Sequence, residues 1–128
     1  MTNPRYRLAH ASVLVADTAT ALAFYRDVLG LQVSARRPAL DFPGAWFELG
    51  ECELHLIERP SPDARTGRPP HAGRDRHIAL HIDDLAPLCA RLDAARIPYT
   101  RSRSGRAAIF CRDPDGNGLE FIATKVAP

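Results

Sequence analysis

Hydrophobic residues in the first half of the chain alternate with polar ones in short runs, interrupted by one longer run at helical spacing. The alternation predicts strands over residues 8–15, 31–33, 46–49 and 52–57. The helical run gives one apolar face, made of Ala21, Leu22, Tyr25, Val28 and Leu29. Asp17 is suited to cap the start of this helix and Gly30 its end. The pattern therefore predicts the order strand, helix, strand, strand, strand.

The second half of the chain predicts the same order again. Its strands are expected over residues 76–82, 99–100, 107–112 and 118–123, with a helix that Asp83 or Asp84 caps and that ends before Pro98. Residues 59–75 are rich in Pro, Gly and Arg and show no periodicity, which favours a linker. We therefore expect one domain over residues 1–128, with modules at 6–58 and 76–124.

Composition narrows the class of protein. The chain has 128 residues, 45% hydrophobic and 25% charged, which is typical of a globular domain. Its 17 basic and 15 acidic residues are too balanced to favour nucleic acid as a partner, and no apolar run is long enough to span a membrane. Cys52, Cys89 and Cys111 are scattered, and the N-terminus lacks the apolar core of a signal peptide. We expect a cytoplasmic protein.

Four residues of metal-binding types stand at equivalent places in the two halves. His10 and His77 lie in the opening strand of each half, and His55 and Glu120 lie in the closing strand. If the halves pack about a pseudo-twofold axis, these side chains converge. Imidazole nitrogen and carboxylate oxygen are the usual ligands of Zn, Ni, Co, Mn and Fe(II). The sequence thus predicts one divalent transition metal ion per site.

Three segments resemble motifs of the vicinal oxygen chelate superfamily, which includes glyoxalase I, extradiol dioxygenases and bleomycin-binding proteins. Residues 22–31 (LAFYRDVLGL) resemble its F-Y-x-x-x-L-G-L helix. Residues 77–80 (HIAL) resemble its G-H-I-A-L strand, and residues 113–120 (DPDGNGLE) resemble its D-P-D-G-x-x-x-E ending. The resemblance extends over about residues 8–123. It implies an α+β fold in which two βαβββ modules form a curved mixed sheet around a metal funnel, commonly in a homodimer.

The resemblance also implies roles for the four residues. His10, His77 and Glu120 match metal ligands of the superfamily, and His55 stands where glyoxalase I carries a glutamate ligand. Glu120 matches the glutamate that acts as the base, and His55 is a second candidate proton acceptor if it leaves the metal. Three imidazoles and one carboxylate leave a positive charge on a divalent ion. Such a site favours a bidentate anionic ligand, for example an enediolate.

These features predict a metal-dependent enzyme of the glyoxalase type, a lyase or isomerase. Its expected substrate is a small oxygenated molecule that chelates the metal through vicinal oxygens. Leu14 and Arg59 stand where glyoxalase I has an arginine and an asparagine that contact glutathione, so lactoylglutathione is not the expected substrate.

Other functions remain open. His10, His77 and Glu120 also form the ligand set of an extradiol-type Fe(II) dioxygenase, although a fourth ligand, His55, would occupy a coordination position that oxygen and substrate need. The other alternative is a drug-sequestering module of the bleomycin-resistance type. Relatives of that type generally lack the metal ligands, so the intact quartet counts against it. No residue supports a thiol transferase that acts on an epoxide antibiotic.

Polar residues other than the four candidate ligands also have expected places or roles. Arg101, Arg103 and Arg106 form either a solvated face or a funnel mouth that favours a carboxylate or phosphate on the ligand. His81 is expected at the rim of the site, and His71, in the linker, is expected in solvent. Asp113 and Asp115 are better explained as turn formers than as a catalytic carboxylate pair.

Overall fold

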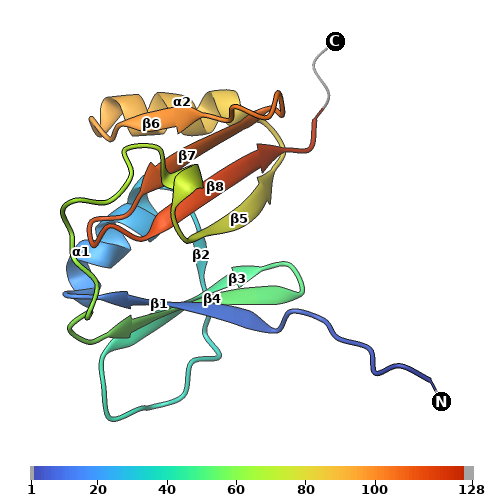
Figure 1. Ribbon diagram of the computed structural model, residues 1–128. Helices are drawn as coiled ribbons and strands as arrows, with labels where there is room; N and C mark the ends of the chain where they lie inside the picture. Colours follow the sequence, from blue (N-terminus) through green and yellow to red (C-terminus); the bar gives the residue numbers. More distant parts are fainter. Residues whose placement is uncertain (1, 126–128) are drawn as a thin grey trace.

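The computed structural model describes residues 2–125 and contains two four-stranded mixed sheets, one from each half of the chain (Figure 1). The first sheet has the order β1-β4-β3-β2, formed by β1 (His10–Val15), β2 (Gln32–Val33), β3 (Gly44–Leu49) and β4 (Cys52–Glu58). The second has the order β5-β8-β7-β6, formed by β5 (His77–Ile82), β6 (Tyr99–Arg101), β7 (Ala108–Arg112) and β8 (Gly118–Ala123). In each sheet the strands that come first and last along the chain pair in parallel, β1 with β4 and β5 with β8. The other strand pairs are antiparallel. This arrangement confirms the predicted α+β fold of two βαβββ modules.

The first helical segment is less regular than its apolar spacing predicts. It starts as α1 (Thr18–Leu22) and continues as a π-helix, η1 (Ala23–Val28). Asp17 caps it as expected, because its carboxylate accepts a hydrogen bond from the Thr20 amide at 2.8 Å. The π-helical part lets two consecutive aromatic residues, Phe24 and Tyr25, both be buried. No simple periodicity signals such a wide turn, which is rare in proteins.

The second helix, α2 (Leu85–Ala94), follows the sequence prediction closely. Asp84 is the capping residue, since its carboxylate accepts a hydrogen bond from the Ala86 amide at 3.1 Å. The linker contains one short 3-10 helix, η2 (Ala72–Arg74). Among residues 2–125, no helix is both long and apolar enough to cross a membrane.

The helices α1 and α2 pack on one face of the sheets; the opposite face, called the open face below, is covered in part by the linker in the second module. On β1, Ala11, Val13 and Val15 join the hydrophobic core, while the alternating residues His10 and Ser12 are exposed. On β5, Ile78, Leu80 and Ile82 pack against the core in the same way, and the residues between them are exposed. The candidate ligands therefore point away from the core because of the two-residue period of the strand.

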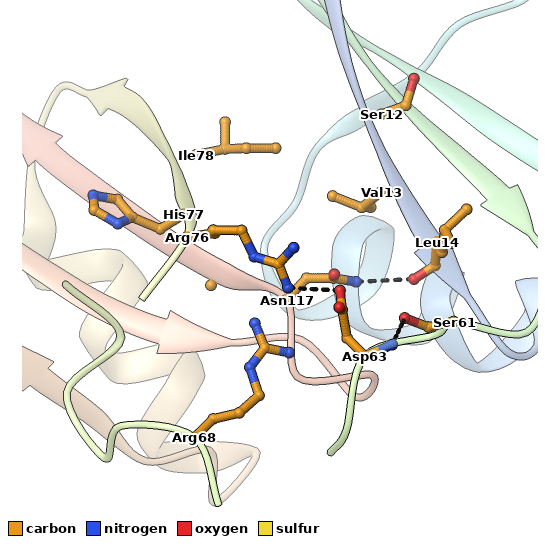
Figure 2. Close-up of a pocket in the computed structure, with 11 residues that line it drawn as sticks. Ser12, Val13, Leu14, Ser61, Asp63, Arg68, Arg76, His77, Ile78 and Asn117 are labelled. Carbon is orange, nitrogen blue, oxygen red and sulfur yellow. Dashed lines mark hydrogen bonds and ion pairs between the residues drawn. The ribbon is translucent and has the colours of Figure 1, made fainter. Parts of the chain in front are cut away.

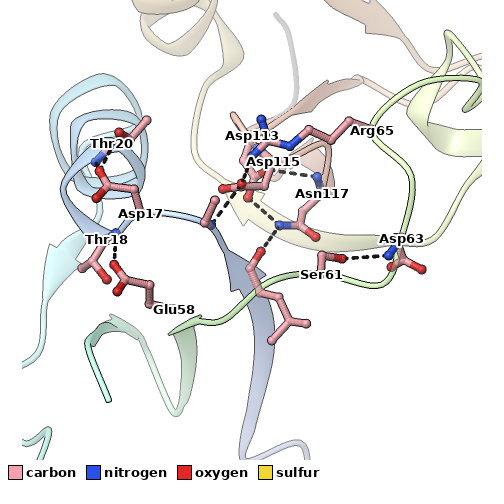
Figure 3. A network of polar contacts seen from close by, with 12 residues as sticks. Asp17, Thr18, Thr20, Glu58, Ser61, Asp63, Arg65, Asp113, Asp115 and Asn117 are labelled. Atoms are coloured by element: carbon pink, nitrogen blue, oxygen red, sulfur yellow. Dashed lines mark hydrogen bonds and ion pairs between the residues drawn. The ribbon is translucent and has the colours of Figure 1, made fainter.

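A polar network joins the two modules near the Asp113–Asn117 turn (Figure 3). The buried Tyr25 hydroxyl donates to Asp113 at 2.6 Å, and the Asn117 side chain donates to the carbonyl of Leu14 at 2.9 Å. Asp115 accepts from the Ala16 amide at 3.1 Å. Burial raises the pKa of Asp113, and its hydrogen bonds from Tyr25 and Asn117 oppose that shift. The turn predicted from the sequence thus also holds the modules together.

Candidate functional site

The two sheets place the same kinds of residue at the same register positions. In the first module, Ser12 lies opposite His55, and His55 lies opposite Trp46. In the second, Ala79 lies opposite Glu120, and Glu120 lies opposite Phe110. Each open sheet face therefore presents a small residue, a ligand-type residue and an aromatic ring in one row. His10 and His77 each lie two residues before the small residue.

His77 and Glu120 form one close pair on the second sheet. The Nε2 atom of His77 lies 3.2 Å from Oε1 of Glu120, and its Nδ1 lies 2.9 Å from the carbonyl oxygen of Asp75. That carbonyl can only accept, so Nδ1 carries the hydrogen and Nε2 of a neutral ring keeps its lone pair. Two lone pairs then face each other. A shared cation, either a proton or a metal ion, resolves this conflict.

The geometry of this pair fits a metal ion. Nitrogen and oxygen ligands lie about 2.0–2.2 Å from a zinc ion, so two donors on one ion are separated by no more than about 4.3 Å. The 3.2 Å between the His77 and Glu120 donor atoms lies within that limit. The carbonyl of Asp75 also fixes the orientation of the imidazole, as such partners do for metal-bound histidines.

Glu120 is the most deeply buried acidic side chain of the site. It is 2% exposed, and its second oxygen, Oε2, accepts a hydrogen bond from Arg106 at 2.9 Å. A buried carboxylate needs such partners because its charge is removed from water. Arg106 supplies one such partner in this structure, and His77 supplies a second when a proton or metal ion lies between it and the carboxylate.

His10 and His55 form the second pair, on the first sheet. Their rings stack at a centroid distance of 4.1 Å, and the other face of His55 stacks on Trp46 at 3.9 Å. Lone pairs of imidazole lie in the ring plane, so two stacked rings do not direct their nitrogens at one ion. His10 is exposed and can rotate, whereas His55 is held between two rings. Chelation by this pair requires a different rotamer of His10.

Glu53 is a residue of the site for which the sequence analysis predicts no role. Its Oε1 lies 3.1 Å from Nε2 of His55, and its Oε2 accepts from Arg36 at 3.1 Å. The hydrogen bond from His55 and the Arg36 guanidinium lower the pKa of Glu53, against the opposing effect of burial. A carboxylate accepts only, so it selects the ring with hydrogen on Nε2 and leaves Nδ1 free. Two-residue alternation along β4 puts Glu53 on the same face as His55, and this spacing is the one sequence feature that could have indicated its role.

The structure brings the four predicted ligands together as two pairs and not as one cluster. Within residues 2–125, no group of three or more His, Cys, Asp and Glu side chains is arranged to hold a metal ion. Strands β1 and β5 line one cavity of about 260 Å³, which shows that they lie near each other (Figure 2). In this view the imidazole of His77 points away from Ser12, Val13 and Leu14. Within residues 2–125, the His77 side chain thus does not point toward the first ligand pair.

The expectation that His71 lies in solvent is wrong. His71 is 9% exposed, and its Nδ1 lies 2.6 Å from the hydroxyl of Thr100. The ring of Phe110 lies between His71 and His77, at centroid distances of 4.7 and 5.3 Å. The linker folds back over the second sheet, a long-range contact that its irregular sequence does not predict. His71 thus lines the same cavity as His77 and Glu120.

The arginines and His81 occupy different surroundings. Arg103 and Arg106 line the cavity with Glu120, whereas Arg101 is exposed on β6. His81 is exposed and lines a mostly apolar cavity of about 470 Å³ between the modules. All three arginines are exposed, and whether Arg103 and Arg106 bind an anion stays a prediction.

Comparison with known proteins assigns the chain to a family. The family model described as Glyoxalase/Bleomycin resistance protein/Dioxygenase superfamily matches residues 7–121. The chain belongs to this superfamily. It is 34% identical to the Escherichia coli protein YaeR, over 88% of this chain and 92% of that protein.

Other relatives in the superfamily have named activities. The chain is 29% identical to a lactoylglutathione lyase of Haemophilus influenzae, over 93% of both proteins. A structure of a variant of FosX, a fosfomycin resistance protein of Listeria monocytogenes, matches with a TM-score of 0.71 at 18% identity, over 96% of this chain and 95% of that one. That structure contains Mn(II) and 1S,2S-dihydroxypropylphosphonic acid. The superfamily fold thus supports different chemistries.

Proposed function

We propose that this protein is a metal-dependent enzyme of the glyoxalase type, a lyase or isomerase that acts on a small oxygenated substrate. One observation carries the proposal: ligand-type side chains occupy register-equivalent positions on the open faces of both sheets. In the second module these are His77 and Glu120, whose facing lone pairs favour a bound cation. A divalent ion would supply a Lewis acid that polarises two vicinal substrate oxygens.

The protein's own residues would then position and deprotonate the substrate. Glu120 is the proposed base, which takes a proton from the carbon beside a carbonyl group. His77 is held in one orientation by the Asp75 carbonyl, and His55 by Glu53 and by its two stacked neighbours. His55 is the alternative proton acceptor. Ser12 and Ala79, both small and exposed, leave room for the substrate above the sheets.

We further propose that the complete site is formed between two chains in a homodimer. His10 and His55 of one chain would face His77 and Glu120 of the other. The open sheet faces support this arrangement, because each ligand pair in a single chain faces away from the core. The Mn(II) in the FosX structure supports metal chemistry, whereas the differing names of the similar proteins do not select a substrate. Leu14 and the exposed Arg59 argue against lactoylglutathione, as the sequence predicts.

Elemental analysis tests the proposal. The tag-free protein is compared with His10→Ala and His55→Ala variants, each folded as judged by circular dichroism. We expect one equivalent of a divalent transition metal per chain in the wild type and its loss in both variants. The matched control is His81→Ala, which removes an exposed imidazole from the same face of β5 as His77. We expect this variant to retain the metal.

Other outcomes would favour the alternatives. Loss of metal only in His10→Ala would favour a three-ligand site, as in an Fe(II) dioxygenase. No metal in any sample would overturn the proposal and favour a drug-sequestering module. The mostly apolar cavity of about 470 Å³ between the modules would then be the place to look for the ligand.

A further inference from the structure

A basic cavity lies directly beside Glu120. Its volume is about 340 Å³, and Arg74, Arg103 and Arg106 line it together with Ser102 and Ser104. Among residues 2–125, Glu120 is its only acidic lining residue, and that carboxylate already pairs with Arg106. Three guanidinium groups around one small cavity favour an anionic ligand over a neutral one.

A metal ion bound at Glu120 would take the place of Arg106 as the partner of this carboxylate. The Arg106 guanidinium contacts Oε2 of Glu120 at 2.9 Å, while the other oxygen of Glu120 faces His77. The Glu120 side chain is 3% exposed and the Arg106 side chain 56%. The carboxylate is thus fixed, and the arginine can move into solvent or into the cavity. A divalent cation at Glu120 would neutralise the carboxylate and repel the guanidinium.

The loop keeps Arg106 beside the cavity when this contact is broken. The Nε atom of Arg106 donates to the hydroxyl of Ser104 at 3.3 Å, and the hydroxyls of Ser104 and Ser102 lie 2.8 Å apart. A guanidinium released from Glu120 would therefore lie next to two hydroxyl donors. Such a set matches the oxygens of a carboxylate, phosphonate or phosphate group.

We propose that Arg106 exchanges partners during the binding cycle. Without metal it pairs with Glu120; after a metal ion binds Glu120, it binds an anionic group of the substrate in the adjacent cavity. The substrate class is then a molecule with two chelating oxygens at one end and an oxyanion at the other. This inference rests on the proposed metal-dependent function and adds an order of binding, metal first and anion second.

Two titrations by calorimetry test the exchange. The first adds Mn²⁺ to the metal-free wild type, to Arg106→Gln and to Arg103→Gln. Both variants lose one charge from the same cavity, but of these two arginines Arg106 is the one that pairs with Glu120 in the described part of the chain. We expect Arg106→Gln to bind Mn²⁺ about fivefold more tightly than the wild type, the worth of an exposed ion pair, and Arg103→Gln to change by less than about twofold.

The second titration adds methylphosphonate, and separately acetate, to the metal-free and Mn²⁺-loaded proteins. We expect the metal to strengthen anion binding to the wild type. Arg106→Gln should lose most of that gain and Arg103→Gln should keep most of it. A larger effect with methylphosphonate would identify a tetrahedral oxyanion, and one with acetate would identify a carboxylate.

The outcomes separate the inference from the function on which it rests. If the wild type binds no metal, both are overturned. If it binds metal but the two variants behave alike in both titrations, only the role of Arg106 is overturned. If the metal-free wild type binds the anion as tightly as the loaded protein, the exchange of partners is wrong.

Discussion

At the scale of single residues, the chemistry of the site depends on the hydrogen-bond partner of each imidazole. His77 gives its Nδ1 hydrogen to a backbone carbonyl, so its Nε2 lone pair faces Glu120. His55 gives its Nε2 hydrogen to Glu53, so its Nδ1 is free. The two histidines therefore present different nitrogens, although they have the same side chain.

Asp75 gives a pH-dependent prediction. Hydrogen bonds from Arg68, from the Arg76 amide and from Arg112 hold its pKa well below the ordinary value near 3.9. Its contribution to the free energy of unfolding is therefore complete above that ordinary value and is lost as the pH falls below it. We expect urea unfolding between pH 5 and pH 3 to show a smaller loss of stability in Asp75→Asn than in the wild type.

The control for Asp75 is Asp41→Asn, which changes an exposed carboxylate outside this arginine cluster. This variant should follow the wild type over the whole pH range. An equal loss of stability in wild type and Asp75→Asn would contradict the argument.

Cys111 is predicted to be unreactive in the folded protein. It is 3% exposed, and burial, together with the charge of Asp113, raises its pKa to about 12. A thiol reagent such as dithionitrobenzoate should label it only after unfolding, whereas Cys52 and Cys89 are partly exposed. Cys111→Ala should therefore react like the wild type when folded and show one thiol fewer in denaturant. A missing thiol in the folded variant would disprove the prediction.

At the scale of elements, the close approach of β3 and β4 depends on a glycine at position 44. A Cβ atom added at Gly44, the first residue of β3, would lie 2.2 Å from the carbonyl oxygen of Leu56 on β4. Backbone atoms cannot move aside as a flexible side chain can. The Trp46–His55 stack depends on this same strand pair, so the glycine also supports the site.

Substitution of Gly44 tests this argument. We expect Gly44→Ala to lower the free energy of unfolding by about 3 kcal/mol, because the methyl group would force the two strands apart. The comparison is Gly50→Ala, where an added Cβ has no non-neighbouring atom of residues 2–125 within 4 Å and the positive φ of +64° is the unfavourable feature. That variant should lose about 1 kcal/mol. Equal losses, measured by urea unfolding, would show that the close approach is not limiting.

At the scale of the whole molecule, strands β1 and β5 of the two separate sheets line a common cavity, and within residues 2–125 the two ligand pairs do not form one cluster. Tyr25, Asp113 and Asn117 hold the modules in this arrangement. If a homodimer completes the site, each site takes one pair from each chain. This arrangement predicts that two inactive variants can complement each other.

Complementation can be measured with two double variants. His10→Ala/His55→Ala lacks the first pair, and His77→Ala/Glu120→Gln lacks the second; each should bind no metal alone. Unfolded together and refolded as a mixture, they should form heterodimers with one intact site, and the bound metal should rise to about one quarter of the wild-type value if chains pair at random. A site formed within one chain would give no recovery. Sedimentation analysis of the mixture serves as the check that dimers form.

The sequence by itself determined the fold and the identity of the candidate ligands. Periodicity and capping residues such as Asp17 and Asp84 are local, so the order of strands and helices could be predicted from neighbouring residues. Duplication then placed His10, His55, His77 and Glu120 at equivalent positions. The π-helical turn after Leu22 gave no such signal.

Only the tertiary structure decided how these residues meet their partners. Side-chain directions determine three of these features. They are the burial of His71, the hydrogen bond between His55 and Glu53, and the pairing of Arg106 with Glu120. His71 and Arg106 also depend on where irregular segments fold back. Spacing along the chain does not fix such contacts, because a linker or loop has no period that ties its residues to one face. For the same reason the division of the ligands into two pairs became visible only in three dimensions.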